Sequence, residues 1–157
     1  MDAIKHTATF AIDQPVEDLF PLFSPEGEKL WVPGWDYENI MGTADLAEDY
    51  IFLTRRHDHL SGKAIWLVKK YDPASYLIEY YRVEPEDKVG VVTVQCFSRG
   101  PALTDVQVSY KYIALSEKGR HFIKNFTADT YTAFINQWRK LLRAYFHTVI
   151  RSSTSDV

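Results

Sequence analysis

The C-terminal third of the chain carries an amphipathic helical pattern that is too long to stand alone in a protein of 157 residues. Ser116 and Glu117 form a helix-start signal, and from Arg120 onward large apolar residues recur at helical spacing: Phe122, Phe126, Phe134, Trp138, Leu141, Leu142 and Tyr145. The pattern predicts one helix that ends near Ile150 and is roughly 45 Å long. Its apolar stripe has to be buried against a second layer of structure.

The segments before this helix alternate in polarity as strands do. Residues 4–13 and 103–114 show the alternation most clearly, since every second residue is apolar. Turn residues such as Asp72-Pro73 and Gly100-Pro101 separate the other segments. Further strands are predicted at about 37–43, 49–56, 62–71, 75–83 and 88–98. Because no helical period interrupts residues 37–114, these strands should form an antiparallel meander.

Two short helices are predicted between the first and second strands. Pro15 suits the first turn of one helix, and Ser24 caps another that has Pro25 in its first position. The order is therefore one strand, two short helices, six strands and one long helix. This order predicts an α+β fold in which a seven-stranded sheet packs against the C-terminal helix.

Composition limits what such a fold can do. With 46% hydrophobic and 25% charged residues the chain is expected to be one globular domain over residues 1–157, with a frayed tail at 151–157. A net charge of −3 argues against a nucleic-acid partner. No signal peptide and no apolar run of about 20 residues is visible, so the expected location is cytoplasmic, without stable membrane insertion.

Several short motifs, in this order, resemble the START-like superfamily, also called SRPBCC or helix-grip, which includes the plant pollen-allergen fold and the polyketide cyclases. They are Phe10-x-Ile12, Pro15-x-Glu17-x-x-Phe20, Trp31-Val32-Pro33-Gly34-Trp35, Phe52-x-Thr54, Trp66-x-Val68, Ile78-Glu79-Tyr80, Val106-x-Val108-x-Tyr110 and Ala114-Leu115-Ser116-x-x-Gly119. The resemblance covers residues 4–150. It implies a helix-grip fold, with a curved antiparallel sheet of seven strands (β-α-α-β6-α) wrapped around the long helix, and a deep apolar cavity between the two layers.

An unusual share of aromatic residues, 15% of the chain, fits such a cavity. Strand parity and helical spacing direct rings at it from both layers, which suits a flat or aromatic ligand. The expected ligand-binding residues are Trp35, Phe52, Trp66, Tyr80, Cys96, Tyr110, Phe126, Phe134 and Trp138. The alternative is that these rings simply fill the space between the layers. Cys96 in particular is expected to be a buried structural residue.

Four residues are weak candidates for proton transfer. His6 alternates in step with the apolar residues Phe10 and Ile12, so it is expected to point inward, either as a catalyst or as a core histidine with a structural hydrogen bond. Glu79 would act as a base only if a bulge turned its side chain inward. If the side chain points outward, Glu79 is a surface charge. Tyr80 and Tyr110 could donate hydrogen bonds to a ligand or to the backbone, and Arg82 could meet an acidic ligand at the cavity mouth or lie on its rim.

Metals and cofactors are not expected. His57 and His59 would share one face of a strand, but two ligands do not make a metal site and no third is placed beside them. One cysteine excludes an intrachain disulfide and an all-cysteine zinc site. Nucleotide-binding and nucleophile motifs are missing from the sequence.

Three hypotheses follow for function. The first is binding of a small hydrophobic molecule, aromatic or lipid-like, without chemistry, by a monomer or homodimer. The second is an enzyme of the polyketide cyclase/dehydratase type that uses the same cavity, with His6, Glu79, Tyr80 or Tyr110 assisting proton transfer. The third is a partner-binding module resembling chaperone activators, which would need an exposed apolar patch.

Overall fold

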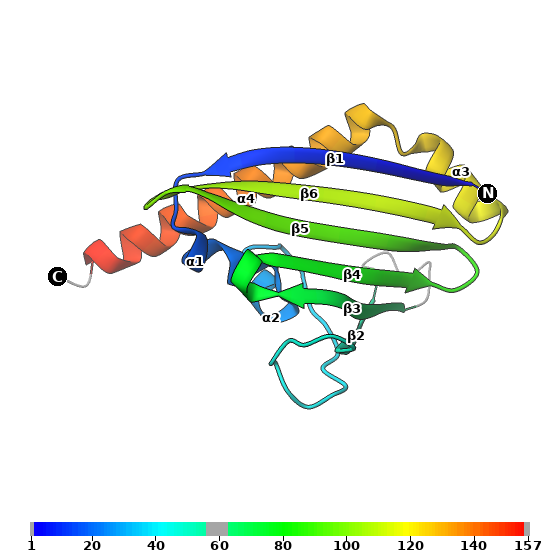
Figure 1. Ribbon diagram of the computed structural model, residues 1–157, viewed down its shortest axis with the longest axis horizontal. Coiled ribbons are helices and arrows are strands. Elements are labelled where there is room, and N and C mark those ends of the chain that lie inside the picture. The colour runs from blue at the N-terminus through cyan, green and yellow to red at the C-terminus, as the bar shows by residue number, and fades with distance from the viewer. Residues whose placement is uncertain (1, 56–62, 156–157) are drawn as a thin grey trace.

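A computed structural model describes residues 2–55 and 63–155 and shows one antiparallel sheet gripping a long C-terminal helix (Figure 1). The strands are β1 (Ala3–Ile12), β2 (Ile51–Thr54), β3 (Ala64–Asp72), β4 (Leu77–Glu84), β5 (Lys88–Gly100) and β6 (Leu103–Ala114). The helices are α1 (Val16–Leu19), α2 (Pro25–Glu28), α3 (Glu117–Asn125) and α4 (Ala128–Ser155), with 3-10 turns η1 (Phe20–Phe23) and η2 (Pro73–Ser75).

The sheet order β1-β6-β5-β4-β3-β2 is a meander of five strands, with β1 returned to pair beside β6. The register puts Tyr110 opposite His6 on one side and opposite Val92 on the other. Val92 in turn pairs with Tyr80, and Tyr80 with Val68. Residues of one such row point to the same face, so strand parity decides which side chains meet the helices. We call this line the tyrosine row.

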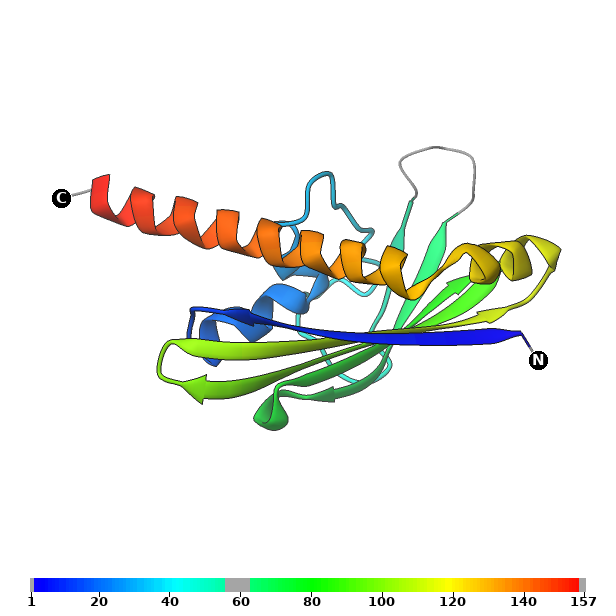
Figure 2. The ribbon, with the colours of Figure 1, turned by 90° about the horizontal axis from the view of Figure 1, so that it is seen from above.

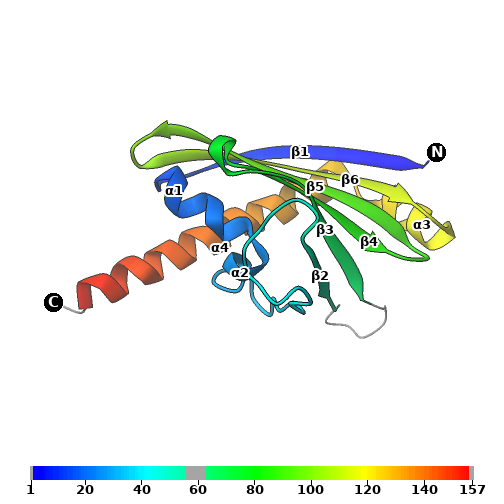
Figure 3. The same ribbon diagram turned by 60° about the horizontal axis from the view of Figure 1, so that its bottom comes forward.

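All four helices lie on one side of the sheet (Figures 2 and 3). In Figure 2 the long helix α4 crosses the concave face, and α1 and α2 lie beside it. The C-terminal part of α4 extends past the end of the sheet (Figures 1 and 2). The core is the layer between them, where Val106, Val108 and Leu142 are completely buried. The expected α+β helix-grip arrangement is thus confirmed in its layers and order.

The prediction of a seventh strand at 37–43 was wrong. The described residues form a six-stranded sheet, and this segment contributes only an isolated bridge between Glu38 and Leu53. The chain turns away immediately afterwards, because the Gly42 amide donates to Asn39 Oδ1 at 3.1 Å and Gly42 has a φ of 74°. An Asx turn followed by a left-handed glycine ends any strand at that point.

The expected single C-terminal helix is two helices. Phe126 has a ψ of 74°, which interrupts the helical hydrogen bonds, and Thr127 begins the next helix by accepting from the Thr130 amide at 3.2 Å. Gly119 permits α3 to pack tightly on the β4–β5 turn, since a Cβ there would lie 2.0 Å from the Asp87 carbonyl oxygen. Helix α4 continues to Ser155, past the expected end near Ile150.

Candidate functional site

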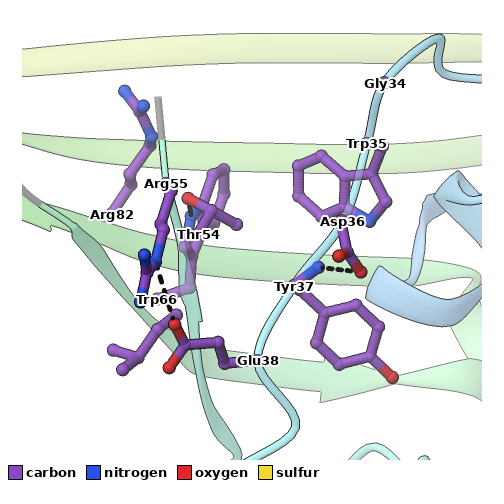
Figure 4. A pocket seen from close by; sticks show the side chains of 10 residues that line it. Gly34, Trp35, Asp36, Tyr37, Glu38, Thr54, Arg55, Trp66 and Arg82 are labelled. Atoms are coloured by element: carbon purple, nitrogen blue, oxygen red, sulfur yellow. Dashed lines mark hydrogen bonds and ion pairs between the residues drawn. The ribbon is translucent and has the colours of Figure 1, made fainter. Parts of the chain in front are cut away.

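The principal candidate site is a pocket of about 480 Å³ at the β2 edge of the concave face (Figure 4). It lies between the loop at 34–38 and the strands β2, β3 and β4. Its lining consists of Gly34, Trp35, Asp36, Tyr37, Glu38, Leu53, Thr54, Arg55, Trp66 and Arg82. Pockets that hold small organic ligands are of this size. We call it the indole pocket, after its two tryptophans.

The two indole rings of the pocket are held by hydrogen bonds to the protein. Trp66 Nε1 donates to Thr54 Oγ1 at 2.9 Å, and Trp35 Nε1 donates to the Pro25 carbonyl oxygen at 2.8 Å. The ring centroids are 6.1 Å apart and the planes are nearly perpendicular, at 78°. Phe52 stacks on Trp66 at 5.5 Å and 11°. Because the N–H groups are already bonded and Phe52 covers one face of Trp66, the rings offer a ligand only the apolar surface that lines the pocket.

Three charged groups of the pocket, Glu38, Arg55 and Arg82, form ion pairs, whereas Asp36 accepts a hydrogen bond from the Tyr37 amide at 2.9 Å. Arg55 Nε and Lys63 Nζ lie 3.2 Å and 3.1 Å from Glu38 Oε1, and Lys63 first, then Arg55, holds the pKa of Glu38 below its usual value. On the inner wall, Arg82 forms an ion pair with Glu84, and its guanidinium carbon is 5.4 Å from the centre of the Trp66 ring. The pocket therefore combines aromatic surfaces with charges of which Glu38, Arg55 and Arg82 are compensated within the protein.

The tyrosine row lies one step deeper than the pocket wall, since Tyr80 is the next inward residue before Arg82 on β4. The Tyr80 ring contacts Trp66 at 5.7 Å, edge to face. Its hydroxyl donates to the Phe23 carbonyl oxygen at 2.7 Å. Tyr110 is 8% exposed, and its hydroxyl makes no hydrogen bond to any residue in 2–55 or 63–155. Burial, above all, raises the pKa of both tyrosines well above the usual value.

Glu28, the last residue of α2, is an interior acid that the sequence analysis did not single out. Burial raises the pKa of its carboxyl to about 8, and its side chain has no hydrogen-bond or ion-pair partner in the described part of the chain. The residue is half-buried by surface area. Helical spacing could have found it, because Glu28 is three residues after the buried Pro25, on the same face of α2.

The same architecture occurs in proteins of known structure. No family model and no curated protein matches the sequence. Among solved structures, Ara h 8.0201 aligns with a TM-score of 0.67 at 12% identity, over 95% of this chain and 99% of that one. Norcoclaurine synthase from Thalictrum flavum, in complex with dopamine and hydroxybenzaldehyde, aligns at 0.64 and 15% identity, over 90% and 87%. The chain therefore has the helix-grip fold of these solved structures. Protein MLL2253 from Mesorhizobium loti shares this helix-grip fold at 0.60 and 14% identity, over 90% and 98%.

The remaining ligand-binding candidates occupy several places in the helix-grip fold. Trp138 lies between sheet and α4, with its ring 6.2 Å from that of Tyr110. Phe134 stands beside it but is 40% exposed, so it points only partly at the sheet. Phe126 lines a separate pocket under α3, and Cys96 lies in the core, where burial raises its thiol pKa to about 12. Of the expected set, the structure brings only Trp35 and Trp66 to the indole pocket itself.

Two of the proton-transfer candidates are committed elsewhere. His6 Nε2 donates to the Phe126 carbonyl oxygen at 2.8 Å and its ring stacks on Tyr131 at 5.6 Å. Glu79 faces away from the helices, accepts from Thr93 Oγ1 at 2.6 Å and lies 3.1 Å from Lys69 Nζ. Burial alone would raise the Glu79 pKa, but the Thr93 hydrogen bond and Lys69 leave it lowered.

Metal ligands do not gather in the described ranges. Across residues 2–55 and 63–155, no group of three His, Cys, Asp or Glu side chains is close enough to hold an ion. His57, Asp58 and His59 lie outside the described residues. No helix within the described ranges has the length and apolar character needed to cross a membrane.

Proposed function

We propose that this protein binds a small, largely hydrophobic molecule with an aromatic portion in the indole pocket, with Trp35 and Trp66 as the contact surfaces. The observation that carries the proposal is that both indoles are fixed through their N–H groups while the two rings line a pocket of about 480 Å³. Rings that are already held in place lose little conformational freedom when a ligand packs on them. Edge-to-face contacts of this kind add about 0.5–1.5 kcal/mol beyond the burial of apolar surface.

The fold supports the same proposal by analogy. Norcoclaurine synthase, with the same helix-grip fold, is described in complex with dopamine and hydroxybenzaldehyde, which are both small aromatic molecules. In this chain the residues behind the pocket continue the aromatic lining, with Phe52 stacked on Trp66 and Tyr80 edge-on to it.

Binding is favoured over the two alternative functions on specific contacts. A cyclase-type reaction was expected to use His6, Glu79, Tyr80 or Tyr110, and the first three are engaged in hydrogen bonds within the protein. A chaperone-activator role would need a continuous apolar patch on the outer sheet face. That face carries paired charges such as Lys69 with Glu79 and Arg99 with Asp105.

The proposal is tested by titrating the protein with 2-acetylnaphthalene, a neutral aromatic probe, in isothermal titration calorimetry. Trp66→Ala and Trp35→Ala should each weaken binding about ten-fold, because each removes one wall of the pocket. The matched control is Trp138→Phe, which alters an aromatic residue outside the pocket lining. Circular dichroism checks that every variant is folded. Absence of saturable binding to the wild type, or pocket variants that bind as tightly as the wild type, would overturn the proposal.

A further inference from the structure

The guanidinium of Arg82, which lines the indole pocket, has hydrogen-bond donors that the protein does not use. Its Nη1 donates to Glu84, whereas Nε and Nη2 make no hydrogen bond to any residue in 2–55 or 63–155. These two nitrogens are not sealed off from solvent, because within the same ranges only Asp87 Oδ1 is a buried side-chain atom without a hydrogen bond. The N–H groups of Nε and Nη2 therefore remain available to a further partner.

The sheet fixes Arg82 beside one of the two indoles. Arg82 is directly opposite Trp66 in the pairing of β3 with β4, and both residues line the pocket (Figure 4). The guanidinium carbon lies 5.4 Å from the centre of the Trp66 ring. The Arg82 side chain is only 18% exposed, so its charge stays near the protein instead of extending into solvent. A charged group bonded directly to a ring that packs beside Trp66 would come within reach of this guanidinium.

Glu84 does not depend on Arg82 alone for the compensation of its charge. Lys88 Nζ lies 3.4 Å from Glu84 Oε2 and 3.5 Å from Asp87 Oδ1, and Lys118 Nζ lies 3.7 Å from Asp87 Oδ2. Glu84 is thus placed between two cations, Arg82 and Lys88. Because a buried charge has to be paired, this arrangement matters: Arg82 can bind a second carboxylate while Glu84 still has Lys88.

The other charged groups of the pocket are more exposed than Arg82. Asp36 is exposed, and the side chains of Glu38 and Arg55 are 39% and 72% exposed. Glu38 also lies between two cations, since Arg55 and Lys63 are both ion-paired with it. Water and salt screen exposed charges strongly, whereas a pair formed with a half-buried group is screened less. Arg82 should therefore decide which ligand charge the pocket prefers.

We propose that the ligand of the indole pocket is an aromatic carboxylic acid, and that Arg82 binds its carboxylate through Nε and Nη2. The inference rests on the proposed function, since it names the class of molecule that the same pocket takes. These two nitrogens form one edge of the planar guanidinium, and such an edge can donate two parallel hydrogen bonds to the two oxygens of a carboxylate. Trp35 and Trp66 would then contact the aromatic part of the ligand.

The test compares 2-naphthoate with 2-acetylnaphthalene, which has nearly the same shape and no charge, by titration calorimetry at pH 7.5. The wild type should bind the acid about ten-fold more tightly than the ketone. Arg82→Met keeps a long apolar side chain and should abolish that preference. Arg82→Lys keeps the charge without the planar fork and should reduce the preference to about three-fold. The matched control is Arg99→Met, which removes one cation that is ion-paired with Asp105 on the outer face and should leave the preference unchanged.

A third probe tests the inference on the wild type alone, so it holds even if Arg82→Met does not fold. Protonated 2-(aminomethyl)naphthalene should bind more weakly than the ketone, because Arg82 repels a cation. Tighter binding of this amine than of the acid would show that the pocket carboxylates decide the ligand charge. That result, equal affinity for acid and ketone, or an unchanged preference in a folded Arg82 variant overturns this inference and leaves the proposed function standing, since the ketone still binds. Failure of all three probes to bind overturns both.

Discussion

Tyr80 and Tyr110 face the same interior from strands β4 and β6, but within residues 2–55 and 63–155 only the Tyr80 hydroxyl is hydrogen-bonded, at 2.7 Å from the Phe23 carbonyl oxygen. Two chemically identical side chains in one row across the sheet therefore have different roles. The Tyr80 hydroxyl joins the sheet to the turn that precedes α2. The Tyr110 hydroxyl makes no hydrogen bond to a residue in the described ranges.

This difference predicts opposite effects on stability. Tyr80→Phe leaves the buried Phe23 carbonyl oxygen without its donor and should lower the free energy of unfolding by about 1–2 kcal/mol. Tyr110→Phe removes a hydroxyl that has no hydrogen-bond partner among residues 2–55 and 63–155, so it should be neutral or slightly stabilising. Urea denaturation with unchanged m-values measures both. A larger loss in Tyr110→Phe than in Tyr80→Phe would contradict the assignment of these roles.

Trp138 should behave as a core residue. It is 9% exposed and its ring lies 5.5 Å from Trp31 and 6.1 Å from Phe23, so it joins α4 to the segment that carries α2. Trp138→Ala should cost about 3–5 kcal/mol of stability. A loss below about 1 kcal/mol, measured by thermal and urea unfolding, would show that the ring borders open space instead.

Glu28 should make the protein less stable as the pH rises. Its carboxyl holds its proton up to about pH 8 in the folded state, whereas the unperturbed value is 4.5. The folded state therefore binds more protons between these values, and stability falls with increasing pH across that window. Because the residue is partly exposed, the loss is on the order of 2 kcal/mol, smaller than the full shift would imply.

The matched comparison is Glu28→Gln against Glu48→Gln, since Glu48 is exposed. The stability difference between Glu28→Gln and the wild type should move in favour of the variant from pH 5 to pH 9. Glu48→Gln should track the wild type throughout. Parallel curves for all three proteins would refute the raised pKa of Glu28.

Gly119 is predicted to be intolerant of any side chain. Its Cβ would lie 2.0 Å from the backbone oxygen of Asp87, so Gly119→Ala must push α3 away from the β4–β5 turn. We expect a loss of about 2–4 kcal/mol. Gly100→Ala serves as the control, because nothing lies within 4 Å of a Cβ at that site. If both variants unfolded at the same urea concentration, the close packing of α3 would be disproved.

The local sequence pattern was sufficient to predict an element wherever one of its faces is buried and the other is exposed to solvent. The alternation in residues 4–13 and 103–114 predicted which side chains of β1 and β6 turn inward, because a one-residue shift would expose the whole apolar set. The order of elements followed from turn residues, and with the motifs it pointed to the helix-grip fold. The inward directions of Tyr80, Tyr110 and Trp66 were found in this way.

Long-range contacts decided what the pattern left open. The helix break at Phe126 coincides with the hydrogen bond from His6, a partner 120 residues away that no local period reveals. The strand expected at 37–43 was lost to a turn centred on Gly42. Glu28 acquired its raised pKa only because α2 lies over the sheet, where burial removes the water that stabilises a carboxylate. The sequence by itself determined the layers and the aromatic interior, whereas the tertiary structure decided which polar groups in that interior have partners and which do not.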